Sequence, residues 1–381
     1  KPLEPFSYTD DINKSILKIK PQRYLKSRAT KNGSPNYLVK TTERIAEELI
    51  KNERGIIIVG PMGYDREQIT KIKKLSTILK YPVFADGISQ LRFGVSKKDK
   101  NIISNFNAIL QSENFVYKHD PDIILQFGRT PTSSEIETFL SDSKADRYVI
   151  NQYGDLFDPT RNAKATRAVE PKSFCESLIS KCNSEKISRH KSNWIKDFIK
   201  AEEISSKIKS NVIESSKFPN EPAIIAEIFK SIPSGSSIFI GNSLPVRDLD
   251  NFLGTESNRF TLHFNRGASG IDGVTSTALG IAIRKKPTIL ITGDLSFLHD
   301  LNALLIASKY SILITVIVIN NNGGGIFETL PIAQKVNRFG EFFIASHNLD
   351  LSGIVKSFGI KHQLVNSRSQ LNSYLLKSLK G

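Results

Sequence analysis

The sequence predicts an α/β protein with two doubly wound domains, each built around a mainly parallel sheet. Short apolar runs alternate with longer amphipathic stretches along most of the chain, and this alternation is typical of parallel sheets covered by helices. Two consecutive apolar runs near the carboxyl end are followed by polar, glycine-containing turns. With 381 residues, of which 39% are hydrophobic, the chain can bury two ordinary domain cores.

The first sheet is expected within residues 41–183, the predicted central domain. Its strand candidates are 55–60, 81–84, 122–127 and 147–151, with amphipathic stretches between them. The segment VGPMG at 59–63 contains two glycines three residues apart but lacks the further glycine of a dinucleotide fingerprint. A tight turn from strand to helix is therefore the preferred interpretation of this segment.

Residues 184–220 are charged and helical in pattern, and we expect them to connect the two domains. Trp194 and Phe198 are spaced i to i+4 on one face of this segment. The second domain is expected at 221–381. Its predicted helices are 223–232, 301–310 and 370–379, and its predicted strands are 237–240, 260–264, 287–292 and 312–319.

The last two predicted strands each lead into a motif with metal-binding chemistry. The first is Gly293-Asp294-Leu295-Ser296, and the second is Asn321-Asn322-Gly323. A right-handed parallel crossover would bring the two strand ends side by side. Mg²⁺ prefers hard oxygen ligands, and Asp294, Asn321 and the carbonyl of Gly323 could supply three, with diphosphate and water as the others. Taken singly, a helix N-cap and a tight turn are the structural alternatives.

The backbone around the first motif could serve the anion that accompanies such a cation. Gly293 and the amides of Leu295 and Ser296 come at a predicted helix start, where N–H groups face outward and favour phosphate. The sequence therefore predicts a magnesium diphosphate site at this edge of the second sheet.

Four sequence blocks of the second domain resemble the MenD family of thiamine-diphosphate-dependent enzymes. They are GNSLPVRDLD at 241–250, NRGASGIDG at 265–273, GDLSFLHDLNALL at 293–305 and NNNGGGIFETLPIAQ at 320–334. The resemblance implies a thiamine-diphosphate-binding fold preceded by a dinucleotide-fold-like central domain. It implies thiamine diphosphate with Mg²⁺ or Mn²⁺ as cofactors. It also implies a reaction of menaquinone or phylloquinone biosynthesis, in which 2-oxoglutarate is decarboxylated and the succinyl-semialdehyde carbanion adds to isochorismate.

The same resemblance assigns roles to further residues. Both substrates are anions, so Arg247 and Arg266 are the expected catalytic arginines, with Ser243 as a hydroxyl partner. The structural alternative for each arginine is a surface ion pair that contributes little to stability.

Apolar residues complete the expected site. Ile271 is expected beneath the bent cofactor, and Gly324 and Ile326 are expected to contact it, while Phe327 and Leu330 are expected to line the substrate pocket. The alternatives are an ordinary core isoleucine for Ile271 and helix packing for the others. His263 and His299 have the protonation range for acid-base work, but no partner is identifiable, and both are interpreted as structural.

Two departures from the family pattern bear on activity. The family uses a glutamate from an N-terminal pyrimidine-binding domain, and no residue here matches it. Residues 1–40, beginning KPLEPFSY, are interpreted as the linker from that missing domain, and the end at Gly381 as a truncation. The expected assembly is a homodimer or homotetramer that includes the missing domain. In the loop 128–134, Ser134 stands where the family usually has lysine, with Arg129 as a candidate substitute.

Composition excludes several other classes of protein. No run of 18 apolar residues is present, and the net charge of +15 is spread over single lysines without an aromatic-interleaved basic motif. A membrane span and specific nucleic-acid binding are therefore disfavoured. Cys175 and Cys182 lack metal-ligand spacing and are interpreted as ordinary thiols. Abundant Lys, Ile, Asn and Ser indicate an AT-rich genome, so a bacterial cytoplasm or a plastid stroma is expected.

Two alternatives to the MenD-like function remain at this point. One is another 2-oxo acid decarboxylase or a relative of acetohydroxyacid synthase. The other is a non-catalytic or split remnant that binds thiamine diphosphate only.

Overall fold

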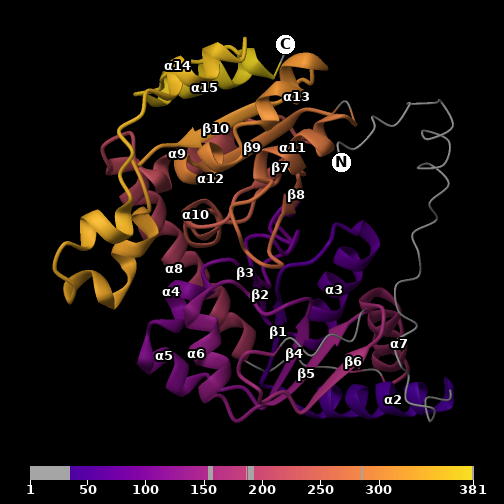
Figure 1. The fold of residues 1–381 in the computed structure, drawn as a ribbon. Helices are drawn as coiled ribbons and strands as arrows, with labels where there is room; N and C mark the ends of the chain where they lie inside the picture. The colour runs from indigo at the N-terminus through magenta and orange to yellow at the C-terminus, as the bar shows by residue number, and fades with distance from the viewer. Residues whose placement is uncertain (1–34, 153–157, 186, 188–192, 285, 380–381) are drawn as a thin grey trace, which may run out of the picture.

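A computed structural model describes residues 35–152, 158–185, 187, 193–284 and 286–379. It contains two sheets in which every strand pair is parallel, with helices on both sides (Figure 1). The predicted α/β fold class is therefore confirmed. Most of the predicted linker lies outside the described residues. Its last part differs from the expectation, because helix α2 begins at Pro35.

The first sheet has six strands in the order β3-β2-β1-β4-β5-β6. The strands are β1 Gly55–Val59, β2 Val83–Ala85, β3 Ile102–Ile103, β4 Ile123–Phe127, β5 Asp146–Asn151 and β6 Ala165–Ala168. This is the strand order of dinucleotide-binding folds, as expected for the central domain. The sequence analysis missed β3 and β6 because two and four residues give too short a hydrophobic pattern.

Helices cover both faces of this sheet because its strands alternate the direction of their side chains. Ile57 and Val59 of β1 pack in the cluster that includes α2, α3 and α7, whereas Ile56 and Ile58 pack in the cluster that includes α4, α6 and α8. The predicted aromatic pair lies in the second cluster, where the ring centroids of Trp194 and Phe198 are 5.1 Å apart. These helices and the short α5 span α2 Pro35–Lys51, α3 Arg66–Leu79, α4 Phe106–Leu110, α5 Glu113–Lys118, α6 Ser134–Asp142, α7 Pro171–Ser184 and α8 Trp194–Ser215.

The second sheet has four strands in the order β10-β9-β7-β8. The strands are β7 Ser237–Ile240, β8 Thr261–Phe264, β9 Thr288–Gly293 and β10 Thr315–Ile319. The helices are α9 Glu221–Ser231, α10 Leu244–Phe252, α11 Val274–Ala282, α12 Asp294–His299, α13 Ala303–Lys309, α14 Leu351–Ser357 and α15 Arg368–Ser378. The helix predicted at 301–310 is shorter than expected, and α12 precedes it.

Short helical turns follow β10 and project at the left of Figure 1 in yellow-orange. They are η1 Gly325–Thr329, η2 Pro331–Gln334 and η3 Gly340–Ile344. None of their residues is buried. This segment is therefore a surface appendage attached at the carboxyl end of the second sheet.

A buried polar cluster joins the two sheets around Arg92, whose side chain is fully buried. Its Nη2 donates to Asp250 Oδ1 over 2.6 Å, and its Nη1 donates to the carbonyl of Leu253 over 2.8 Å. Asn107 Nδ2 donates to the other oxygen of Asp250 over 2.9 Å. Helix α8 packs against both α4 and α9 and so also links the two halves. The exact domain boundaries remain a prediction.

The structure bears on the expectations about a membrane span and about the two cysteines. Within the described ranges, no helix is long and apolar enough to cross a membrane. Cys175 and Cys182 are buried in α7, and burial raises the pKa of Cys175 well above its usual range. A thiol with a raised pKa is a weak nucleophile, so Cys175 behaves as a packing residue.

Candidate functional site

The ends of β9 and β10 bring the two predicted metal-binding motifs together. The strands are parallel neighbours in which Ile319 pairs with Gly293, so Asp294 and Asn321 leave the same edge of the sheet one and two residues later. Helices α12 and α13 form the crossover between them. The side chain of Asp294 is 2% exposed, whereas Asn321 is exposed. A buried carboxylate thus lies beside an accessible amide.

Hydrogen bonds hold these two side chains in defined orientations. Asp294 Oδ1 accepts from the backbone N–H of Leu295 over 2.7 Å, and Oδ2 accepts from the N–H of Gly323 over 2.8 Å. Asn321 Nδ2 donates to Glu221 Oε1 over 3.0 Å, which leaves its Oδ1 without a hydrogen bond in the described part of the chain. Burial raises the pKa of Glu221, opposed by that hydrogen bond and assisted by the charge of Asp294.

The oxygen donors present fit a magnesium ion that takes its remaining ligands from another molecule. Among the described residues, no group of three or more His, Cys, Asp or Glu side chains could hold a metal. One carboxylate, one amide oxygen and one backbone carbonyl are too few for octahedral coordination by protein alone. Sites of this kind usually add substrate phosphates and water, which agrees with the predicted diphosphate.

The turn after β10, residues 320–325, contains glycines at positions where a side chain would not fit. Gly323 has φ of 140°, and a Cβ there would lie 2.2 Å from the carbonyl oxygen of Ile344. A Cβ on Gly324 would lie 2.8 Å from the ring of Phe327. Any side chain at either position would push away the segment that packs on the turn.

The predicted arginines lie at the carboxyl ends of β7 and β8. Arg247 Nη1 donates to the carbonyl of Ser243 over 2.8 Å, and Arg266 Nη1 donates to Asn242 Oδ1 over 3.4 Å. Burial lowers the pKa of both arginines, and the charge of Arg247 lowers that of Arg266 further. Neither forms a salt bridge within the part of the chain that the structure describes. The surface ion pair considered as the alternative is therefore not observed for either arginine. Their catalytic role stays a prediction.

Ser243 has an uncommon backbone conformation, with φ of 71° and ψ of −132° at the start of α10. Non-glycine residues adopt positive φ at a cost, and such residues concentrate at functional sites. The neighbouring Asn242 is buried, and its Nδ2 donates to the carbonyls of Asn265 and Gly270 over 3.0 and 2.7 Å. Asn242 thus fixes the loop that carries Arg266 and Ile271, a role that the sequence analysis missed.

The predicted apolar residues are not core residues. Ile271 and Ile326 are half-buried, and the exposed fractions of Phe327 and Leu330 are 39% and 44%. The ring centroid of Phe327 lies 6.3 Å from that of Phe343 in η3. These side chains are available to a ligand, and their assignment to the cofactor and the substrate stays a prediction. Of the remaining two cofactor residues, Ser296 is buried and Leu295 is half-buried.

Two parts of the site lie against each other. A Cβ added at Gly325 would lie 3.6 Å from Leu244 Cδ1, so the turn after β10 lies close to the first residue of α10. From the first sheet, Arg129 Nη1 donates to the carbonyl of Arg266 over 3.3 Å. Ser134 begins α6, and its Oγ donates to Glu135 over 3.1 Å.

Histidines differ in their relation to the site. His299 is 3.5 Å from the exposed Asp272, and burial lowers the pKa of His263 on β8. Asp272 is a neighbour of His299 that the sequence analysis did not identify, and the structural interpretation of both histidines stays a prediction. His347, which the sequence analysis did not single out, has its Nε2 3.2 Å from Asp294 Oδ2.

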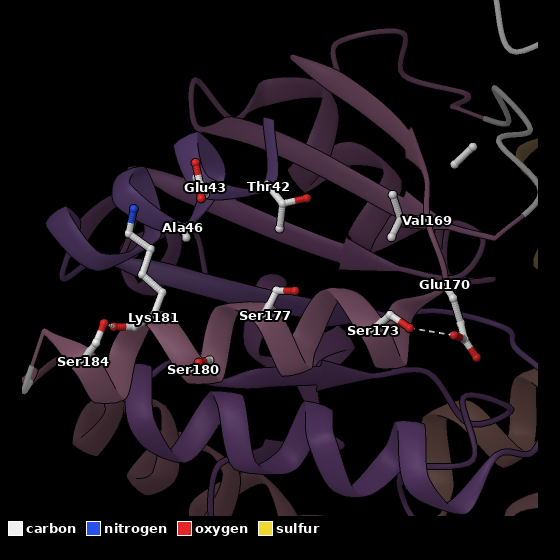
Figure 2. A pocket seen from close by; sticks show the side chains of 11 residues that line it. Thr42, Glu43, Ala46, Val169, Glu170, Ser173, Ser177, Ser180, Lys181 and Ser184 are labelled. Atoms are coloured by element: carbon white, nitrogen blue, oxygen red, sulfur yellow. Dashed lines mark hydrogen bonds between the residues drawn. The ribbon is translucent and has the colours of Figure 1, made fainter. Parts of the chain in front are cut away.

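A separate hollow of about 820 Å³ lies between α2, β6 and α7 in the first half of the chain. Figure 2 shows serines of α7 facing it, with Ser173 hydrogen-bonded to Glu170 over 2.7 Å. Its charged side chains are those of Glu43, Glu170 and Lys181. It contains none of the predicted site residues, so the site at the second sheet does not extend into it.

Two family models match the chain. The model described as "Middle domain of thiamine pyrophosphate" matches residues 26–240, and "Thiamine pyrophosphate enzyme, C-terminal TPP binding domain" matches residues 250–381. These matches support binding of thiamine diphosphate in the second half of the chain. Neither model description mentions a metal.

Curated relatives carry the name 2-succinyl-5-enolpyruvyl-6-hydroxy-3-cyclohexene-1-carboxylate synthase. The chain is 36% identical to the one from Trichodesmium erythraeum, over 86% of this chain and 57% of that protein. It is 32% identical to the Geobacillus kaustophilus protein over 91% of this chain and 59% of the relative. It is also 32% identical to the Rippkaea orientalis protein, over the whole chain and 63% of the relative. The chain thus spans about three fifths of the length of these relatives.

Proposed function

This chain belongs to the thiamine pyrophosphate enzyme family, and we propose that it carries the diphosphate-binding part of a synthase of the kind named in its relatives. The proposed reaction decarboxylates 2-oxoglutarate and joins the remaining four-carbon unit to isochorismate. It would serve menaquinone or phylloquinone biosynthesis.

The observation that carries this proposal is the shared position of the two polar groups. Asp294 and Asn321 leave neighbouring strand ends, and the turn after Asn321 lies close to α10, which carries Arg247. Oxygen atoms suited to a cation and guanidinium groups suited to an anion would therefore serve one ligand at this edge of the sheet. Ligands of open α/β sheets bind outside the carboxyl ends of the strands.

Cofactor binding would use groups whose orientation is already fixed. Asp294, Asn321 and the Gly323 carbonyl would hold Mg²⁺ or Mn²⁺, and the N–H groups at the start of α12 would face the diphosphate. Thiamine diphosphate, when bound, supplies the nucleophilic carbon for decarboxylation and carbon–carbon bond formation. Ile271 would support the cofactor from the loop that Asn242 fixes.

Substrate binding would use the two half-buried arginines. Guanidinium groups bind carboxylates through two parallel hydrogen bonds, and neither Arg247 nor Arg266 has a carboxylate partner in the described part of the chain. Ser243 would add a hydroxyl group, and Phe327 and Leu330 would form an apolar wall. Such a wall excludes water from the carboxylate that is lost.

The proposed active form is a homodimer or homotetramer that also contains a pyrimidine-binding domain. A glutamate from that domain would promote cofactor activation. No residue of this chain is matched to that glutamate, so activity should be measured in the complete protein encoded by the gene.

The proposal is tested by isochorismate-dependent release of CO₂ from 2-oxoglutarate, with pyruvate as the competing substrate. Arg247→Lys should reduce kcat/KM by roughly 10- to 100-fold, because a single ammonium group cannot reproduce two parallel hydrogen bonds. Arg284→Lys, at an exposed arginine, is the matched control and should retain activity.

The alternatives give different results in this assay. Turnover of pyruvate without isochorismate would indicate another 2-oxo acid decarboxylase or an acetohydroxyacid-synthase-like enzyme. Binding of thiamine diphosphate without turnover of either substrate would indicate a non-catalytic remnant.

A further inference from the structure

Residues 344–349 form a short segment, here named the clasp, that packs on the turn after β10. Gly324 N–H donates to the carbonyl of Ile344 over 2.6 Å. Asn322 and Asn348 exchange two hydrogen bonds of 2.8 Å, one from Asn322 Nδ2 to Asn348 Oδ1 and one from Asn348 N–H to Asn322 Oδ1. The clasp is thus attached to the turn at both of its ends.

Two residues of the clasp have a costly backbone conformation, and the hydrogen bonds to the turn offset this cost. Ala345 and Asn348 have φ of 53° and 51°, in the left-handed region. Each such non-glycine residue has a conformational cost. The clasp therefore keeps this shape because the turn holds it, and the shape places the intervening His347.

His347 reaches from the clasp to the buried carboxylate. Its side chain is 10% exposed, and its Nδ1 accepts from the N–H of Leu349 over 3.0 Å. Because Nδ1 is an acceptor, Nε2 carries the ring proton in the neutral imidazole. Nε2 therefore donates to Asp294 Oδ2 over 3.2 Å.

The two carboxylate oxygens of Asp294 have different hydrogen-bond partners. Oδ2 accepts from both Gly323 N–H and His347, whereas Leu295 N–H is the one donor to Oδ1 among the described residues. A carboxylate oxygen has two lone pairs, so one lone pair of Oδ1 remains for a cation. Mg²⁺ prefers oxygen to imidazole nitrogen, so His347 is not expected to be a ligand.

We propose that His347 is a positioning residue of the divalent-cation site, which holds Asp294 Oδ2 so that Oδ1 faces the cation, and that the clasp exists to place it. This inference rests on the proposed function, because it assumes the cation site at Asp294. Partners that fix a ligand in this way usually change metal affinity by 10- to 100-fold when they are removed.

The test is a titration of the full-length protein with Mn²⁺ in the presence of thiamine diphosphate, followed by electron paramagnetic resonance of free Mn²⁺. His347→Ala should weaken Mn²⁺ binding by about 10- to 100-fold. His347→Gln keeps an N–H donor and should recover most of the affinity. His362→Ala, at a histidine without a hydrogen bond among the described residues, is the control and should bind Mn²⁺ normally.

A second variant tests the clasp without changing His347. Asn348→Gly removes the hydrogen bond from Asn322 Nδ2 at a position whose φ suits glycine. It should weaken Mn²⁺ binding by about threefold, as the loss of one neutral hydrogen bond would. Thermal unfolding without Mn²⁺ checks that each variant folds.

Two results would overturn the inference. Binding of Mn²⁺ by His347→Ala within twofold of the parent would overturn it and leave the proposed function intact. Equal weakening in the alanine and glutamine variants would also overturn it, because the donated hydrogen bond would then be irrelevant. Failure of the parent itself to bind Mn²⁺ would instead remove the proposed cation site, and this inference with it.

Discussion

Asp250 and Asp294 are both buried aspartates, but they lie in regions with opposite electrostatic arrangements. Asp250 lies between the two sheets and accepts from the Arg92 guanidinium, Asn107 Nδ2 and the N–H of Gly87. Asp294 lies at the edge of the second sheet, where its partners are two backbone N–H groups and His347. No lysine or arginine pairs with it in the described part of the chain.

We interpret the difference as that between a structural carboxylate and the proposed cation ligand. A buried charge is costly unless it is paired, and Arg92 provides that pairing for Asp250. At Asp294 the pairing is incomplete, which is expected where the compensating charge comes from a ligand. The predictions below test whether the two regions can be altered independently.

The largest effect is expected at the cation site. Asp294→Ala should abolish Mg²⁺-dependent binding of thiamine diphosphate, a loss of at least about 100-fold, because the only carboxylate ligand is removed. Stability without the metal should change much less than cofactor binding, because removal of a buried carboxylate is offset by loss of the hydrogen bonds from Gly323 N–H and His347. Isothermal titration calorimetry and thermal unfolding measure the two quantities. Unaltered cofactor binding would refute the site.

Arg92→Leu should have the reverse profile. It leaves Asp250 buried without a cation, and breaking a buried pair from one side typically destabilises a protein by about 3–5 kcal/mol. Denaturant unfolding measures this loss. The exposed Arg259 provides the control Arg259→Leu, which should change stability by less than about 0.5 kcal/mol. If Arg92→Leu lowers the free energy of Mg²⁺ binding by more than it lowers the free energy of unfolding, the two regions are not independent.

The third effect depends on pH and is expected at Asp248, two residues before Asp250 in α10. Burial raises the pKa of Asp248 to about 7, with a contribution from Glu221 and opposition from Arg247. Because the folded pKa is above the unfolded value, the associated stability is present below about pH 4 and is lost as the pH rises through about 7. Asp248→Asn should therefore stabilise the protein near pH 8, by up to about 4 kcal/mol, and leave it unchanged near pH 4.

Denaturant unfolding at these two pH values measures that prediction. A stabilisation of equal size at both would show that the effect does not come from ionisation. Asp272→Asn, at an aspartate whose side chain is 84% exposed, is the control and should have little effect at either pH.

The parts of the site that sequence reasoning predicted depend on local pattern and strand topology. Apolar runs place Asp294 and Asn321 after strands, and the handedness of parallel crossovers makes those strands neighbours, as the pairing of Ile319 with Gly293 confirms. His347 could not be found in this way. It is 53 residues after Asp294, in a segment without period, and its position depends on left-handed residues that the sequence does not mark.

Arg92 escaped prediction for a different reason. Charged residues are almost never fully buried, so composition assigns an arginine to the surface. Its acceptors at Asp250 and Leu253 are supplied by the second half of the chain, far away in the sequence. Likewise, β3 and β6 become strands because a neighbouring strand offers hydrogen bonds, and their own residues have little pattern.

The contacts around Arg92 also limit how this molecule can change shape. Gln90 exchanges two hydrogen bonds with the backbone of Leu262, and the backbone of Phe93 and Gly94 continues that contact along residues 256–258. A hinge between the sheets would have to break all of these bonds and expose a buried charge. We therefore expect any change of shape that admits a ligand to occur in the surface loops of the second half, while the two sheets keep their relative positions.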